Sequence, residues 1–362
     1  MLRRDWMRLA LVAIAAAMLL QAPLAQTPEG FGARIAALSE PAGYFDTDNL
    51  ISNEASYLQV IPALASRGGP GGAYIGVGPD QNFTYIAAVR PSIAFILDIR
   101  RDNMLLHLLF KALFAMADTR VEYLSLLFGR EPPPQPAGWR AVGIDRIVAH
   151  VERRRMPHEA IASLRARVDE GVGRLGVPLS DSDRRTIDRF HRRFIEAGPD
   201  LRFQSTGRPP RSSYPTYREL LLASDPSGTR SCFLASEDAY AFVRELQARD
   251  LVIPVMGDVS GPKAMLAIGR FLAHRRERVS AIYVSNVESY LFGDGRFAGY
   301  IANLGKLPTA PGAVVIRSAF GPYASNGWRG GYSSSHVQPL SALLQRWEAG
   351  EIRRYADVLA RD

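Results

Sequence analysis

Two glycines and a carboxylate in the first third of the chain have the types and spacing of a nucleotide-type binding site. Gly76 and Gly78 end one short apolar segment, and Asp98 ends the next one, 20 residues beyond the second glycine. Glycine lets a backbone turn sharply and approach a ligand closely. A carboxylate at that distance, at the tip of the following strand, can accept both hydroxyl hydrogens of a ribose. We therefore predict that residues 73–98 form a ligand crevice; a plain turn, with Asp80 capping a helix, is the structural alternative.

Further polar residues follow two later apolar segments. Asp258 comes just after one of them, and Asn286, Glu288 and Tyr290 come just after the next. In an open parallel sheet, ligands bind outside the carboxyl ends of the strands, where these residues would lie. Glu288 could take a proton there and Asn286 could orient a substrate, with ordinary loop or helix-cap roles as the alternative.

The elements that must position these residues follow an alternating strand and helix order. Strands are predicted over 73–78, 93–98, 251–256, 279–285 and 314–318, and helices over 30–38, 53–65, 81–89, 103–117, 262–274 and 340–359. The strands are apolar on consecutive positions, which indicates a parallel sheet covered on both faces. The predicted fold class is α/β, with a Rossmann-like, mostly parallel sheet.

A different kind of segment interrupts this order. A proline-rich stretch over 132–136 leads into three predicted helices, over 143–155, 158–175 and 181–197, in which arginines outnumber acidic residues. A solvated helical lid or subdomain is the simpler interpretation, and a polyanion-binding surface is the alternative. The predicted organisation is a leader over 1–29, the first part of the α/β domain over 30–130, a helical Arg-rich insertion over 131–200, and the remainder of the domain with its closing helix over 201–362.

Composition restricts the classes of partner. The net charge is +8 and the pI is about 9.7. The basic residues are almost all arginines spread along the chain, so nucleic acid is not the expected partner. Cys232 is the only cysteine, which excludes an internal disulfide and a thiolate metal cluster, and the six histidines are scattered. We therefore expect no metal site.

The N-terminus resembles a secretory leader. Arginines precede an apolar run over 9–20, and Ala22 and Ala25 are candidate cleavage residues. This pattern predicts export, or a membrane association through the N-terminus. If the true start is Met7 or Met18 instead, the protein would be cytoplasmic.

The motifs together carry a resemblance to a known superfamily. Gly76-Val77-Gly78, Asp98, Gly257-Asp258 and Ser285-Asn286 follow the order of the glycine loop, ribose acid, adenine-side acid and post-strand-four loop of class I S-adenosylmethionine (SAM)-dependent methyltransferases. Residues 74–85 and 49–54 resemble segments of an uncharacterised bacterial family with this methyltransferase-like fold. The resemblance covers about residues 31–330.

The resemblance implies a cofactor and a set of site residues. SAM would be bound by Glu54, Gly76, Gly78, Asp98 and Asp258, and methyl transfer would involve Asn286, Glu288 and Tyr290. Asp80 stands where the superfamily has a third glycine, and a carboxylate there would favour the cationic sulfonium of SAM over a pyrophosphate. The post-strand-four sequence lacks the Asn-Pro-Pro-Tyr pattern of amino-group methylases, so the methyl acceptor stays open.

Two other functions remain open from the sequence. SAM is made in the cytosol, so a true export leader would instead favour an envelope-associated binding protein on a Rossmann-like scaffold without methyl-transfer activity. A nucleic-acid modifying enzyme, with the Arg-rich insertion holding phosphates, is the lesser alternative.

Overall fold

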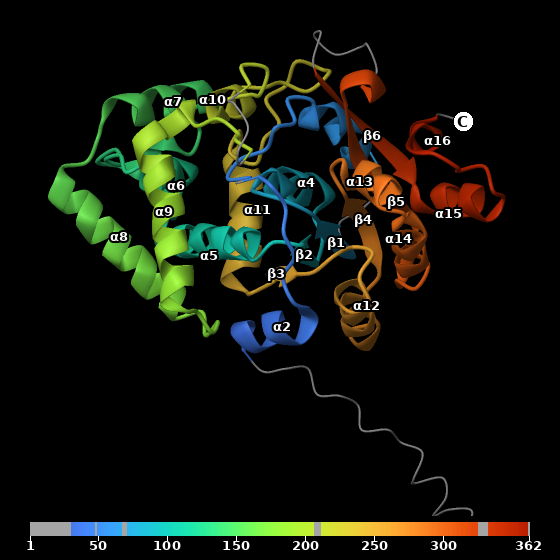
Figure 1. Cartoon of the computed structure of the whole chain (residues 1–362). Helices are drawn as coiled ribbons and strands as arrows, with labels where there is room; N and C mark the ends of the chain where they lie inside the picture. The colour runs from blue at the N-terminus through green and yellow to red at the C-terminus, as the bar shows by residue number, and fades with distance from the viewer. Residues whose placement is uncertain (1–29, 48, 67–70, 206–210, 325–331, 361–362) are drawn as a thin grey trace, which may run out of the picture.

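A computed structural model describes residues 30–47, 49–66, 71–205, 211–324 and 332–360. Its centre is a six-stranded sheet with the strand order β3-β2-β1-β4-β5-β6 (Figure 1). The strands are β1 (Ala73–Gly76), β2 (Ile93–Asp98), β3 (Val252–Met256), β4 (Val279–Tyr283), β5 (Thr309–Phe320) and β6 (Ser333–Pro339). β1 to β5 are parallel, and β6 runs antiparallel to β5. The prediction of an α/β fold with a mostly parallel sheet is confirmed.

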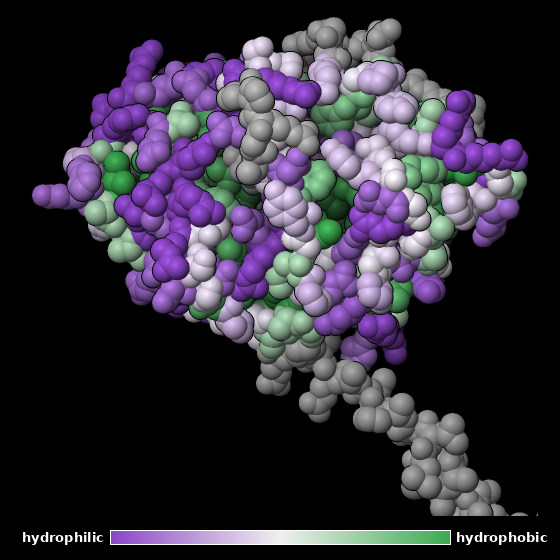
Figure 2. Space-filling model, in the orientation of Figure 1, coloured by the Kyte–Doolittle hydropathy of each residue, from purple (hydrophilic) through white to green (hydrophobic). Residues whose placement is uncertain are grey.

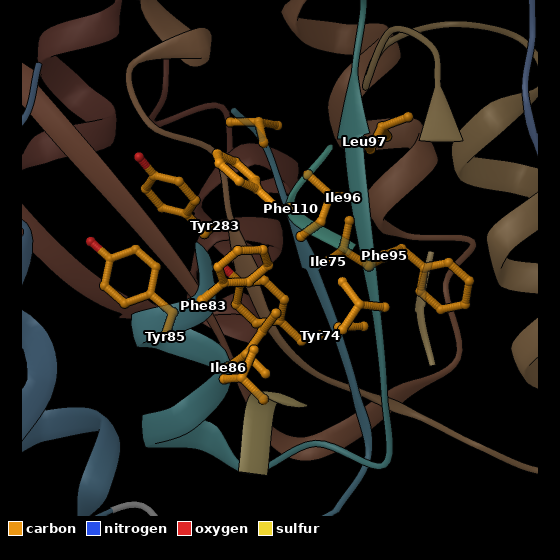
Figure 3. Close-up of a cluster of buried hydrophobic side chains, with 14 of the residues drawn as sticks. Tyr74, Ile75, Phe83, Tyr85, Ile86, Phe95, Ile96, Leu97, Phe110 and Tyr283 are labelled. Carbon is orange, nitrogen blue, oxygen red and sulfur yellow. The ribbon is translucent and has the colours of Figure 1, made fainter. Parts of the chain in front are cut away.

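The central strands form because their residues are apolar on both faces. Every residue of β1 is buried, as are the first five of β2 and the first four of β3. Tyr74 and Ile75 of β1 pack beside Phe95 and Ile96 of β2 in the core that Figure 3 shows. Burial on both faces makes these strands continuous apolar runs, which is why the sequence predicts them well.

Helices cover both faces of the sheet (Figure 1). One layer contains α4 (Gln81–Val89), α5 (Arg101–Met116) and α11 (Glu237–Ala248), which pack on one another. The other contains α2 (Phe31–Leu38), α12 (Ala264–His274) and α14 (Phe297–Leu304). The remaining helices of the domain are α3 (Ile61–Ala65), α6 (Arg120–Leu127), α10 (Tyr217–Leu221), α13 (Val287–Gly293), α15 (Leu340–Glu348) and α16 (Tyr355–Leu359). This covering excludes water from the sheet and leaves the carboxyl ends of the strands as the open side.

The predicted insertion forms three helices at one side of the molecule. They are α7 (Ile144–Arg153), α8 (His158–Gly173) and α9 (Asp181–Ala197), and α8 and α9 both pack on α5. A capping box begins α9: Ser180 accepts a hydrogen bond from the backbone of Asp183, whose carboxylate accepts one from the Ser180 backbone. Figure 2 shows mainly hydrophilic residues over these helices, with some apolar ones between them. The helices thus add a polar outer layer beside the sheet.

Two predicted helices differ in the structure, and one strand forms where none is predicted. The helix predicted over 53–65 is only a 3-10 turn (Tyr57–Val60) followed by α3, since residues 49–56 run as a loop into the core. The closing helix over 340–359 is two helices, separated near Gly350, whose φ is 72°. Residues 333–339, for which no strand is predicted, form β6.

The N-terminal leader lies outside the described residues. Among the residues that are described, no helix is both long enough and apolar enough to cross a membrane.

Candidate functional site

A crevice lies at the carboxyl ends of the parallel strands. Its volume is about 220 Å³. Figure 2 shows the face hollowed near its centre, with apolar residues in the hollow. Six of the predicted site residues line the crevice, namely Glu54, Gly78, Asp98, Asp258, Asn286 and Tyr290. The structure therefore brings together residues that are up to 236 positions apart in the chain, counted from Glu54 to Tyr290.

The glycine turn after β1 is held from behind by two polar side chains. Gly78 has a φ of 84°, which only glycine adopts easily. The Asn82 amide donates to the carbonyl oxygens of Val77 at 2.9 Å and of Pro79 at 2.7 Å. His107 Nε2 donates to the Gly78 carbonyl oxygen at 2.9 Å, and burial lowers the pKa of His107 to about 4, so this ring is neutral near pH 7. These bonds fix the turn that faces the crevice.

Gly76 does not line the crevice, contrary to its predicted role in cofactor binding. Its Cα faces the interior, where a Cβ atom would lie 1.9 Å from Asn82 Oδ1 and 2.6 Å from the Tyr74 hydroxyl oxygen. Tyr74 donates to Asn82 Oδ1 at 2.8 Å. Gly76 is therefore needed for the packing of Asn82, and it acts on the turn only through that side chain.

Replacing Gly76 with alanine is expected to lower the free energy of unfolding by about 1–3 kcal/mol, because the new methyl group must displace Asn82 in a closely packed core. Urea unfolding measures this change. Gly138→Ala is the control, since no atom lies within 4 Å of the added Cβ there. Equal midpoints for the two variants would contradict the assigned role of Gly76.

Asp98 lies at the end of β2 as predicted, but its carboxylate forms an ion pair with Arg100. Its Oδ1 accepts a hydrogen bond from the Arg100 backbone at 2.9 Å, and the Arg100 guanidinium contacts both carboxylate oxygens at 3.2–3.3 Å. Both side chains are largely buried. A carboxylate has about four acceptor positions, so Asp98 can still accept from a ligand hydroxyl, and Arg100 fixes its orientation.

Glu54 is a buried carboxylate with neutral partners. It accepts hydrogen bonds from Gln81 Nε2 and the Tyr283 hydroxyl, both at 2.8 Å, and from the hydroxyls of Ser285 and Ser318. Only 1 % of Glu54 is exposed, and none of its hydrogen-bond donors is charged. The loop over 49–56 places the Glu54 carboxylate in the wall of the crevice.

Ser285 was not among the predicted site residues, although it directly precedes Asn286. It lines the crevice and donates to Glu54, and its φ of 51° lies in the left-handed region. That conformation strains a non-glycine residue, and such strain is concentrated at functional sites. Its position directly after a strand, beside Asn286, is the sequence signal that could have identified it.

Glu288 does not line the crevice, so its predicted role as a proton acceptor there is wrong. It lies on α13, where it is 1 % exposed, and it forms a bidentate ion pair with Arg317 of β5, at 2.6 Å and 3.2 Å. One turn of α13 thus places Asn286 and Tyr290 at the crevice and Glu288 against the sheet. Tyr290 meets the ring of Phe45 edge-on across the crevice, with a centroid distance of 5.0 Å.

The crevice carries more negative than positive charge. Its acidic residues are Glu54, Asp98, Asp258 and Asp294, and its basic residues are Arg100 and Arg296. Arg296 forms ion pairs with both Asp258 and Asp294. A cationic ligand is therefore favoured over an anionic one.

Asp80 lies behind the glycine turn and does not face the crevice, so it cannot contact a sulfonium there. Its carboxylate accepts a hydrogen bond from the Tyr217 hydroxyl in another small cavity, which Cys232 also lines. Burial raises the pKa of Asp80 to about 7, although the bond from Tyr217 opposes the shift. Asp80 also fails to cap α4 with its side chain. Asp80 is therefore a residue of the protein core and not of the crevice.

No group of three or more His, Cys, Asp or Glu residues with the arrangement of a metal site occurs in the described part of the chain.

The comparisons with known proteins identify a family without a known function. The model of the family described as "Domain of unknown function (DUF7790)" matches residues 49–131 and 205–362, which is more than half of the chain. The protein belongs to this family. The matched residues include all of the crevice except Tyr44 and Phe45, and they leave out α7, α8 and α9. No curated protein matches the chain.

Proposed function

We propose that this protein is a SAM-dependent methyltransferase whose acceptor has yet to be identified. The observation that carries the proposal is the crevice itself: a glycine turn and a strand-end carboxylate face a space with a surplus of negative charge. SAM has a cationic sulfonium and a ribose, which suit this lining. A dinucleotide would bring an anionic pyrophosphate to the same place, and the lining would repel it.

The sheet gives separate support. Its order agrees with that of a classic dinucleotide-binding sheet, but its last strand is antiparallel. A sheet that is parallel except for one edge strand suits the methyltransferase-type fold that the sequence motifs resemble.

The chain's own residues have defined parts in such a reaction. SAM would supply an electrophilic methyl group, and the protein would orient the acceptor for in-line attack. Gly78, Asp98 and Asp258 would hold the cofactor. Ser285 and Glu54 together could accept a proton from the acceptor, which is the task first predicted for Glu288, because the Ser285 hydroxyl already donates to the Glu54 carboxylate.

Titration calorimetry of the purified protein with SAM and its demethylated product tests the proposal. Saturable binding is expected, and Asp98→Ala should weaken it about 10- to 100-fold, as expected for losing hydrogen bonds to a charged group. Asp238→Ala is the control, because Asp238 is an exposed surface carboxylate outside the crevice. Absence of SAM binding by the unaltered protein would remove the methyltransferase proposal.

An envelope-associated binding protein without methyl transfer is the second candidate. The pairing of Asp98 with Arg100 favours it, because Arg100 already fills three of the about four acceptor positions of this carboxylate and leaves one for a ribose, which has two hydroxyls to place. A mature N-terminus near Gln26 in the native host would support this candidate and its membrane or export location. An unprocessed cytosolic protein would oppose it.

A further inference from the structure

A second cavity lies beside the crevice, and four of the twelve described residues that line it are arginines. Its volume is about 410 Å³, and it shares Tyr44, Phe45 and Arg100 with the crevice. Among the described residues that line it, the charged ones are Arg100, Arg101, Arg189, Arg193 and Asp102. The two adjoining cavities thus have opposite charge character.

The four arginines come from two elements that meet at this point. Arg100 and Arg101 lie at the start of α5, and Arg189 and Arg193 lie one turn apart on one side of α9. Like charges at this helical spacing repel each other. An anion beside Arg189 would relieve that repulsion.

Three of the four arginines already have partners, and Arg193 donates to Gln204 Oε1 at 3.0 Å. Arg100 and Arg101 are held by Asp98 and Asp183, and neither of these carboxylates lines the second cavity. Arg189 is exposed and lies over the ring of Phe190 at 5.4 Å. Within the described ranges it has no ion pair.

We propose that this cavity binds an anionic group, a carboxylate or a phosphate, of the molecule that accepts the methyl group. The inference rests on the proposed function for the identity of that molecule. The planar guanidinium fork matches carboxylates and phosphates in a bidentate manner. Because Phe45 and Arg100 border both cavities, a molecule held by Arg189 can extend its nucleophilic end past Phe45 into the crevice.

The position of the arginines within the family is informative. Arg189 and Arg193 lie in the segment that the family model does not match, whereas Arg100 and Arg101 lie in the matched part. The inserted helices therefore complete an anion site beside a crevice that belongs to the common domain. They would set the choice of acceptor in this protein.

Calorimetric titration at low salt with inorganic pyrophosphate and with citrate tests the proposal and separates phosphate from carboxylate recognition. At least one of the two should bind the full chain saturably, and Arg189→Glu should weaken that binding at least tenfold. Arg167→Glu is the matched control, since Arg167 is exposed on α8, lines neither cavity and changes the net charge equally. SAM affinity should stay within twofold in both variants.

The outcomes separate the two proposals. Absence of binding by both anions, or equal weakening in the Arg167 variant, would overturn the anion site whatever SAM does. Anion binding that depends on Arg189, without any SAM binding, would support the site and remove the methyltransferase. Unchanged thermal melting of the Arg189 variant would show that its effect is not a loss of folding.

Discussion

Glu288→Gln is expected to lower the free energy of unfolding by about 3–5 kcal/mol, because removing one member of a buried ion pair leaves the other charge uncompensated. The Glu288 and Arg317 side chains are 1 % and 2 % exposed. Glutamine keeps the shape of Glu288 but loses its charge, so the Arg317 guanidinium would keep neutral acceptors such as Gln338 Oε1, at 2.7 Å, without a countercharge. Urea denaturation at pH 7 measures the change.

An exposed ion pair provides the comparison. Glu245 and Arg249 pair at 3.1 Å on α11, with both side chains more than 60 % exposed. Glu245→Gln should change stability by less than about 0.5 kcal/mol. If the two variants lost the same stability, the Glu288–Arg317 pair would not anchor α13 to the sheet.

Asp80→Asn should remove a pH-dependent loss of stability. Asp80 has a pKa of about 7 in the folded protein and about 3.8 in the unfolded chain. Well below pH 4 it is protonated in both states. As the pH rises to 7, the unfolded chain releases this proton while the folded protein keeps it, so the native state loses stability relative to the unfolded state. The full difference is at most about 4 kcal/mol.

The prediction concerns the difference in free energy of unfolding between the Asp80→Asn variant and the unaltered protein, measured as a function of pH. The variant and the unaltered protein should have similar stability near pH 4, and the variant should gain an increasing advantage up to pH 7 and a constant one above it. Other groups, such as His191, whose pKa burial lowers to about 4, affect both proteins equally and cancel. An advantage that did not vary with pH would mean that Asp80 titrates normally.

The sequence predicts best those parts of the fold where one physical constraint dominates. The strands β2 and β3 are buried on both faces, so they show as unbroken apolar runs, and α4 begins and ends at the predicted residues. The strand β6 was missed because Ser333, Ser334 and Ser335 are polar. They are buried nonetheless, because Ser333 and Ser335 bond to Ser56. A polar core strand has no sequence signature of its own.

The site shows the same division. Gly78, Asp98 and Asp258 could be predicted because the ends of parallel strands meet at one edge of a sheet. Glu288 could not be placed, since one turn of helix decides between the crevice and the core. Arg317 is the one charged residue in the apolar run before Ser318. A buried arginine needs an acidic partner, so its position indicated that a buried acid must face it, and that acid is Glu288.

The pairing of β1 with β4 also bears on how the chain folds during synthesis. Ala73 of β1 lies beside Val279 of β4, so the two centre strands of the sheet are separated by most of the chain, including α7, α8 and α9. Contacts between such distant residues form slowly. A nascent chain cannot complete the pairing of β1 with β4 until residue 283 has left the ribosome, and until then one edge of β1 stays unpaired. We expect this protein to depend on chaperones during translation more than its finished stability would suggest.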